Sequence, residues 1–94
     1  MRDSVCTVVR LRLVYLARLR EAFSSVGETL ELPAHDEATV ATVVATLRAR
    51  GGAFASELAP GRAVRFAVNQ RLVRAEHPLA DGDEVAIFPP VTGG

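Results

Sequence analysis

The feature that most constrains the fold is an alternation of apolar and charged side chains near the start of the chain. In the segment 8–16 every second residue is apolar: Val9, Leu11, Leu13 and Tyr15. Arg10 and Arg12 occupy positions between them. Successive side chains of a strand point to opposite faces, so this segment is expected to form a strand with one face buried and the other in water.

A short helix and a second strand are expected next. Helical spacing connects Leu19, Ala22, Phe23 and Val26, and Gly27 is expected to end this helix. Residues 28–33 alternate again, with Leu30 and Leu32 facing inward, Thr29 and Glu31 facing outward and Pro33 as the stop.

The main helix is predicted over residues 40–50. Its apolar positions recur at helical intervals: Val40, Val43, Val44 and Leu47. Thr39 suits the N-cap, while Arg48 and Arg50 complement the negative C-terminal end of the helix dipole. Gly51-Gly52 end the helix, and Phe54 and Leu58 share one side of a further expected turn.

Short strands complete the domain. Residues 64–68 alternate, residues 69–71 are expected to turn, and Leu72-Val73 to return as a short strand. Asp81-Gly82-Asp83 is a strong turn signal before a last strand at 84–88, in which Val85 and Ile87 face inward. This order predicts an α+β fold, a mixed sheet packed on one main helix.

By element order this arrangement resembles the β-grasp, or ubiquitin-like, fold. The first two strands would then be a hairpin, and the first and last strands would be parallel neighbours in the middle of the sheet. The chain divides into a short extension at 1–7, the β-grasp domain at 8–88 and an extended tail at 89–94.

Composition limits the function classes. The chain has 94 residues, 49% of them hydrophobic, which is enough for one small domain with a core. Its 11 basic residues, all Arg, balance 11 acidic residues, which argues against a nucleic-acid footprint or electrostatic membrane binding. The absence of a membrane-length apolar run or a signal-peptide pattern makes the cytoplasm the expected compartment.

Few residues suggest chemistry within the domain itself. The single cysteine, Cys6, can form no internal disulfide and cannot supply the four ligands of an iron–sulfur cluster. His35 and His77 are isolated from other ligand residues, so no metal site is expected. No Ser-His-Asp set is recognisable, and neither a P-loop nor a dinucleotide fingerprint is present.

The tail is where the chemistry is expected. It reads Pro89-Pro90-Val91-Thr92-Gly93-Gly94. The two prolines cannot extend a sheet ladder and are expected to direct the chain away from the domain. Gly93 and Gly94 lack side chains, so they can enter a narrow channel and leave the terminal carbonyl open to attack. This suits a carboxylate that is activated as an acyl-adenylate and converted to a nucleophilic thiocarboxylate.

The segment 79–94 closely resembles the C-terminus of the small-subunit family of molybdopterin synthase (MoaD), within the MoaD/ThiS group of ubiquitin-like sulfur carriers. Residues 15–21, the turn Val68-Asn69-Gln70 and His77-Pro78 are also similar to that family. The resemblance covers residues 8–94, and its C-terminal block is the most specific part.

The resemblance implies a sulfur carrier that is not an enzyme alone. Gly94 would be adenylated by an E1-like enzyme that uses ATP and then thiocarboxylated, while this chain itself would bind no cofactor. The charged tail would enter the large synthase subunit, in an assembly of two small and two large subunits. Sulfur transfer there converts cyclic pyranopterin monophosphate into the dithiolene of molybdopterin, as part of molybdenum cofactor biosynthesis.

The resemblance also implies partner-binding residues: Leu16, Arg20, Leu72 and Phe88 in a patch, with Pro89, Pro90, Val91 and Thr92 in the tail. Strand parity supports this for Leu16 and Phe88, because both alternate with core positions and therefore point outward. An exposed Leu and an exposed Phe on adjacent strands suggest a docking surface.

Three function classes remain open. The first is a sulfur carrier for molybdopterin. The second is a sulfur carrier for another pathway, such as thiamine or a thiolated nucleoside, or a ubiquitin-like protein modifier. The third is an interaction domain without carrier chemistry, for which deletion of Gly94 would change nothing.

Overall fold

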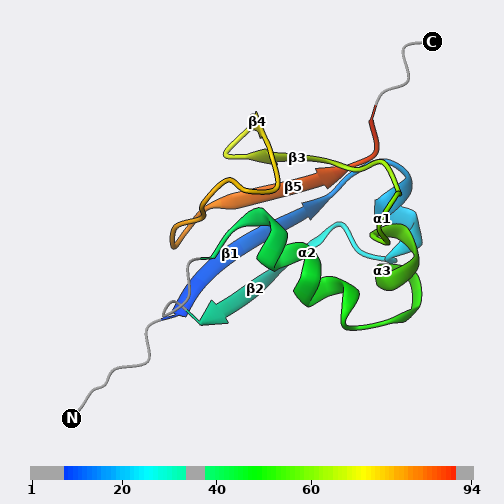
Figure 1. The fold of residues 1–94 in the computed structure, drawn as a ribbon, viewed down its shortest axis with the longest axis horizontal. Helices are drawn as coiled ribbons and strands as arrows, with labels where there is room; N and C mark the ends of the chain where they lie inside the picture. Colours follow the sequence, from blue (N-terminus) through cyan, green and yellow to red (C-terminus); the bar gives the residue numbers. More distant parts are fainter. Residues whose placement is uncertain (1–7, 34–37, 91–94) are drawn as a thin grey trace.

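One mixed sheet with helices on a single face makes up the fold (Figure 1), described by a computed structural model for residues 8–33 and 38–90. The strands are β1 (Val8–Tyr15), β2 (Gly27–Pro33), β3 (Arg65–Val68), β4 (Arg71–Val73) and β5 (Glu84–Phe88). The helices are α1 (Arg18–Ala22), α2 (Val40–Arg48) and α3 (Gly52–Glu57). Figure 1 shows α2 crossing the sheet, while α1 and α3 lie near the end toward which β1 and β5 point.

The strand order in the sheet is β2-β1-β5-β3-β4. β1 and β2 form an antiparallel hairpin, and β1 and β5 are parallel neighbours at the centre. β5 then pairs antiparallel with β3, which pairs with β4. The predicted α+β, β-grasp topology is therefore confirmed, including the parallel central pair that no local signal could show.

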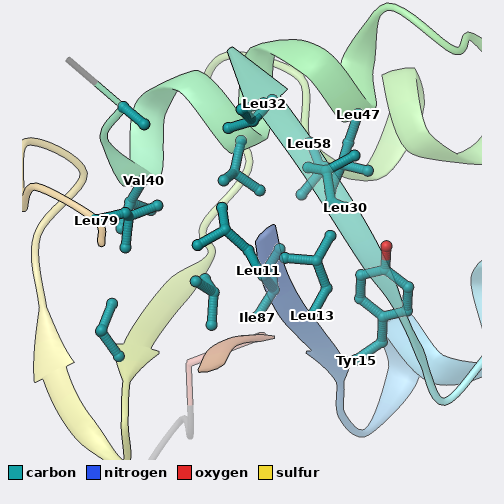
Figure 2. Packing of buried hydrophobic residues seen from close by; sticks show 14 of the residues in the cluster. Leu11, Leu13, Tyr15, Leu30, Leu32, Val40, Leu47, Leu58, Leu79 and Ile87 are labelled. Atoms are coloured by element: carbon teal, nitrogen blue, oxygen red, sulfur yellow. The ribbon is translucent and has the colours of Figure 1, made fainter. Parts of the chain in front are cut away.

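The core lies between the sheet and α2 (Figure 2). It is built from the alternating positions of the strands and one face of the helix. Fully or nearly fully buried members include Leu11, Leu13 and Tyr15 of β1, Leu32 of β2, Val40, Val43 and Leu47 of α2, and Val85 and Ile87 of β5. Their burial fixes which face of each strand is inward, and therefore which face is free.

The main helix begins as predicted. Thr39 is the N-cap: its hydroxyl accepts a hydrogen bond from the Thr42 N–H, and the Thr42 hydroxyl accepts one from the Thr39 N–H. The helix ends at Arg48, earlier than the predicted Arg50, and Gly51 follows with φ 78°. The left-handed φ at Gly51 is favourable only without a side chain, which is why the helix stops here.

Two expectations about the first helix were wrong. α1 ends at Ala22, and Gly27 begins β2 instead of ending a helix. Val26 is 69% exposed, so it does not share the buried side of Leu19 and Phe23. The backbone leaves the helical region because Ser24 has φ 52°, and this turn breaks the spacing that the sequence suggested.

The hairpin of β3 and β4 has a tighter turn than predicted, and β3 begins at Arg65, one residue later than expected. Asn69 and Gln70 form its two-residue turn, both with positive φ (51° and 70°), and Arg71 already belongs to β4. The Asn69 side chain donates to Asp83 (2.9 Å) and accepts from the Glu84 N–H (3.0 Å). These bonds attach the turn to the start of β5, so the hairpin and the last strand hold a common register.

A polar group at the edge of the core connects three elements. The Tyr15 hydroxyl donates to Glu28 (2.6 Å), and Arg50 donates two hydrogen bonds to the same carboxylate, each 2.7 Å long. The Arg50 guanidinium also lies 5.0 Å from the centre of the Phe54 ring. Arg50 therefore links the chain after α2 to β2 and α3, and does not act chiefly on the α2 dipole.

This group makes stability depend on pH. The hydrogen bonds from Arg50 hold the pKa of Glu28 below its usual range. A lowered folded-state pKa stabilises the fold above the unfolded pKa, and this contribution is lost as the pH falls through the folded pKa. We expect Glu28→Gln to lower the unfolding free energy by about 1–2 kcal/mol at pH 7, since the pair is partly solvent-screened.

Urea unfolding at pH 7 and pH 3 measures this effect. The loss in Glu28→Gln should shrink at pH 3, because below its usual pKa the Glu28 carboxyl of the unfolded chain takes up a proton, whereas Arg50 holds the pKa lower in the folded chain. Glu31→Gln is the matched control: Glu31 pairs with Arg10 on an exposed surface, and about 0.5 kcal/mol or less is expected there. Equal losses for Glu28→Gln at both pH values would contradict the assignment.

Candidate functional site: the outer sheet face and the chain end

The last residues that the structure describes, Pro89 and Pro90, follow directly after β5. β5 stops at Phe88, and Pro89 and Pro90 continue outside the sheet, half-buried, at the end where β1 also stops. This agrees with the expectation that the two prolines do not extend the ladder. Val91, Thr92, Gly93 and Gly94 lie outside the described residues, as do Cys6 and His35.

The free face of the sheet carries an apolar row. The register places Val14 beside Ala86, Ala86 beside Ala67 and Ala67 beside Leu72, so one row crosses β1, β5, β3 and β4. Directly paired side chains share a face. Because the neighbouring Leu13, Val85 and Ile87 are buried under α2, this row faces away from the helices.

A second row lies beside it, nearer the chain end. The Leu16 N–H donates to the Ile87 carbonyl (3.1 Å), which places Leu16 alongside Phe88, and Phe88 pairs with Arg65. Leu16 is 41% exposed, Leu72 is 66% exposed and Phe88 is half-buried. Together the two rows form what we call the outer-face patch: Val14, Leu16, Ala67, Leu72, Ala86 and Phe88.

The structure thus brings three of the four predicted patch residues together. Leu16, Leu72 and Phe88 share the outer face, although they come from three distant segments. Arg20 is exposed on α1 instead, close in sequence to Leu16 but outside the sheet rows. Sequence reasoning missed Val14, Ala67 and Ala86, which connect the predicted residues. Their outward parity was visible in the sequence, but the register that aligns them was not.

A strained turn holds Leu16 at the end of its row. The Leu19 N–H donates to the Leu16 carbonyl (3.2 Å), and Ala17 between them has φ 56° and ψ −134°. This region of backbone space suits glycine and costs another residue about 1–3 kcal/mol. The turn takes the chain abruptly from β1 into α1, so the Leu16 side chain stays on the outer face.

Replacing the strained residue tests this geometry. We expect Ala17→Gly to raise the unfolding free energy by about 1 kcal/mol, because relief of strain exceeds the added entropy of the unfolded chain. Chemical denaturation measures the change. Ala41→Gly, on the exposed side of α2, is the matched control and should lower stability by about 1 kcal/mol. Destabilisation by both changes would show that Ala17 is not strained.

The features of the described residues suit the docking of a partner protein. Within residues 8–33 and 38–90, no group of three or more His, Cys, Asp or Glu residues is placed to hold a metal ion. None of the helices in these ranges is long and apolar enough to cross a membrane. What the geometry does provide is an apolar face on four strands, with the chain end leaving beside it.

A five-stranded β-grasp sheet, with helices on one face and the outer-face patch on the other, defines a ubiquitin-like domain. The chain belongs to the ThiS family, which it matches over residues 13–94. It is similar to a protein of Escherichia coli (strain K12) named molybdopterin synthase sulfur carrier subunit. The two are 42% identical over 84 residues, which cover 89% of this chain and 99% of the relative.

Solved structures agree on the fold. The Haloferax volcanii HVO 2177 protein superimposes with a TM-score of 0.79 at 28% identity, covering 100% of this chain and 94% of that one. A Pyrococcus furiosus protein described as putative molybdopterin converting factor, subunit 1, gives a TM-score of 0.73 at 30% identity. The match covers 88% of this chain and 99% of the other.

Proposed function

We propose that this chain is the sulfur carrier subunit of a molybdopterin synthase. The observation that carries the proposal is the outer-face patch beside the point where β5 passes into the Pro-Pro-spaced Gly-Gly tail. Family membership and the name of the Escherichia coli relative support it. The patch docks the partner, and the tail takes the reactive group to a site that the partner supplies.

The proposed chemistry takes place at Gly94. An E1-like partner uses ATP to convert the terminal carboxylate into an acyl-adenylate, with release of pyrophosphate. Sulfur at the oxidation level of sulfide then attacks the acyl carbon, which displaces AMP, releases a proton and leaves a thiocarboxylate. This anion is a strong nucleophile near neutral pH and attacks cyclic pyranopterin monophosphate within the large subunit. The fold contributes docking and reach, so this chain is not an enzyme alone and holds no cofactor of its own.

The proposed assembly is the one that the family resemblance implies. The large synthase subunit receives the tail, and two carriers with two large subunits make a heterotetramer. The activating enzyme uses the same chain end, so its docking surface must also lie near the end of β5. Leu16, Leu72 and Phe88 are the side chains we assign to docking, with Arg20 at the margin and the tail segment 89–92 inside the partner.

The direct test is the intact mass of the chain after incubation with its activating enzyme, ATP and a sulfur source. A gain equal to the exchange of one oxygen for sulfur, located at Gly94 by fragmentation, is the expected result. Transfer of that sulfur to cyclic pyranopterin monophosphate, with the large subunit present, then identifies the pathway. No mass gain with an enzyme that thiocarboxylates its known substrate would overturn the proposal.

A second assay separates carrier from modifier. A protein modifier forms an isopeptide bond between Gly94 and a lysine of a target, which appears as conjugates of higher mass in native extracts. We expect thiocarboxylate without such conjugates. Conjugates in extract, together with failure of sulfur transfer to the pterin, would favour the modifier function.

A further inference from the structure

Two arginines flank the last residue pair at the open end of the β3–β4 hairpin. The pairing ends with Phe66 and Val73; Arg65 precedes Phe66 on β3, and Arg74 follows Val73 directly after β4. Both side chains are exposed, and both line a shallow depression of about 330 Å³ at the open end of the hairpin. Like charges on neighbouring strands repel each other, so this pair disfavours the open end of the hairpin.

Nothing in the described part of the chain neutralises this pair. Four other arginines there have carboxylate partners: Arg10 with Glu31, Arg50 with Glu28, and both Arg18 and Arg62 with Glu57. The remaining four, Arg12, Arg20, Arg48 and Arg71, have none among the described residues. Among residues 8–33 and 38–90, neither Arg65 nor Arg74 has a carboxylate oxygen within 4.0 Å. Glu76 lines the same depression without forming such a pair.

The position of the pair connects it to the outer-face patch. Arg65 is the direct neighbour of Phe88, the last residue of β5 before the prolines. At the other end of β5, Asp81 and Asp83 lie in the turn and Glu84 begins the strand. These acidic groups stand beside arginines of β1, since Glu84 pairs with Arg12 and the Arg10 N–H donates to Asp81. At the end of β5 near the prolines, Arg65 and Arg74 have no such carboxylate neighbour among the described residues. A protein covering the patch therefore meets positive charge on the side from which the tail leaves.

We propose that Arg65 and Arg74 are a partner-selecting pair that binds carboxylates on the rim of the protein receiving the chain end. This inference rests on the proposed function and adds the chemistry of the receiving surface: an apolar depression for the patch, bordered by Asp or Glu near the tail entrance. The two cations steer the encounter and set the direction of the tail, while the apolar residues supply most of the affinity. The repulsion between the two cations in the free chain is relieved when carboxylates of the partner bind them.

The test measures association with the purified large synthase subunit of the same organism, using the full chain, by stopped-flow at low and high salt. We expect Arg74→Glu and Arg65→Glu each to reduce the association rate constant by about tenfold at low salt, with the difference nearly gone at 1 M salt. Arg71→Glu is the matched control: it makes the same change of charge three residues away, at the hairpin's closed end, on the sheet face of its partner Val68. It should change the rate less than about twofold.

Three outcomes decide between the explanations. An equal effect of Arg74→Glu and Arg71→Glu would show a response to net charge alone and overturn the inference. An effect of Arg74→Glu that persists in 1 M salt would show a loss of folding or packing and would also overturn the inference. Thermal unfolding of the free variant checks for that loss. The Arg65→Lys/Arg74→Lys variant keeps both charges and should associate like the wild type.

The experiment also separates this inference from the function on which it rests. If the wild-type chain is thiocarboxylated and binds the large subunit, but the arginine variants behave like the Arg71→Glu control, only the partner-selecting pair is wrong. If the wild-type chain neither acquires sulfur nor binds the large subunit, the proposed function fails.

Discussion

Adding a single alanine after Gly94 should reduce thiocarboxylation and sulfur transfer at least about 100-fold, since a reacting group displaced by even 1 Å from its aligned position loses that much rate. The added residue moves the terminal carboxylate by one residue, about 3.5 Å along an extended chain. A channel that admits two residues without side chains also excludes the new methyl group. Both effects act in the partner's site and leave the domain untouched.

The measurement is the initial rate of thiocarboxylate formation by intact mass, with thermal unfolding recorded in parallel. The melting temperature should not change, because the last fully buried core side chain, Ile87, lies well before the addition. Adding alanine before Met1 is the matched control and should leave the rate unchanged. If the variant extended at its C-terminus acquired sulfur at the wild-type rate, Gly94 would not be the activated residue.

The second large effect is expected on the outer face. Leu72→Asp should weaken binding to the large subunit by about 2–3 kcal/mol, roughly 30- to 160-fold, because it places a charge in an apolar contact from which docking expels water. Leu72 is 66% exposed in the free chain, so folding loses little by the change. Isothermal titration with the purified large subunit measures the dissociation constant.

The chain provides a matched control for this change. Val26 is 69% exposed, slightly more than Leu72, but it precedes β2 and lies outside the outer-face patch. Val26→Asp should alter the dissociation constant by less than about twofold. If both variants lost affinity equally, general surface hydrophobicity would explain the binding, and the assignment of the patch would be wrong. If neither did, the partner would dock elsewhere.

The two effects are independent of each other. The alanine addition acts at the end of the tail and should leave binding nearly unchanged, whereas Leu72→Asp acts on docking and should leave chemistry intact once the complex forms. A saturating concentration of the large subunit should therefore restore much of the sulfur-transfer rate of the Leu72→Asp variant. It should restore none of the rate of the variant with the added alanine. This contrast separates the docking surface from the reactive end.

Local sequence determined most of the secondary structure of this protein. The alternation through Leu11, Leu13 and Tyr15 dictates a strand with one buried face, because side chains of a strand alternate whatever the context. Thr39 and Gly51 mark the ends of α2 by hydrogen-bonding and backbone preferences that act within a few residues. The Pro-Pro-spaced Gly-Gly tail is likewise a local feature, and the prediction that the chemistry takes place at Gly94 rests on it.

Local pattern failed where the backbone departs from a regular period. The helical spacing that extended to Val26 did not account for the turn at Ser24. The positive φ of Ser24 could not be predicted from its residue type. The same holds for Ala17, where packing forces a conformation that alanine by itself avoids. Arg50 also differed from expectation, because Glu28 lies 22 residues away in sequence and was brought near only by the fold.

The outer-face patch and the arginine pair were decided by tertiary structure. Parity shows that Leu16 and Phe88 point outward, but only the parallel pairing of β1 with β5 makes them neighbours. Arg65 and Arg74 come together at the open end of one hairpin because Phe66 pairs with Val73, and a slip of that register would shift one arginine against the other. Sequence sets the face of a side chain through local geometry, whereas its neighbours depend on pairings between distant segments that only the packed core selects.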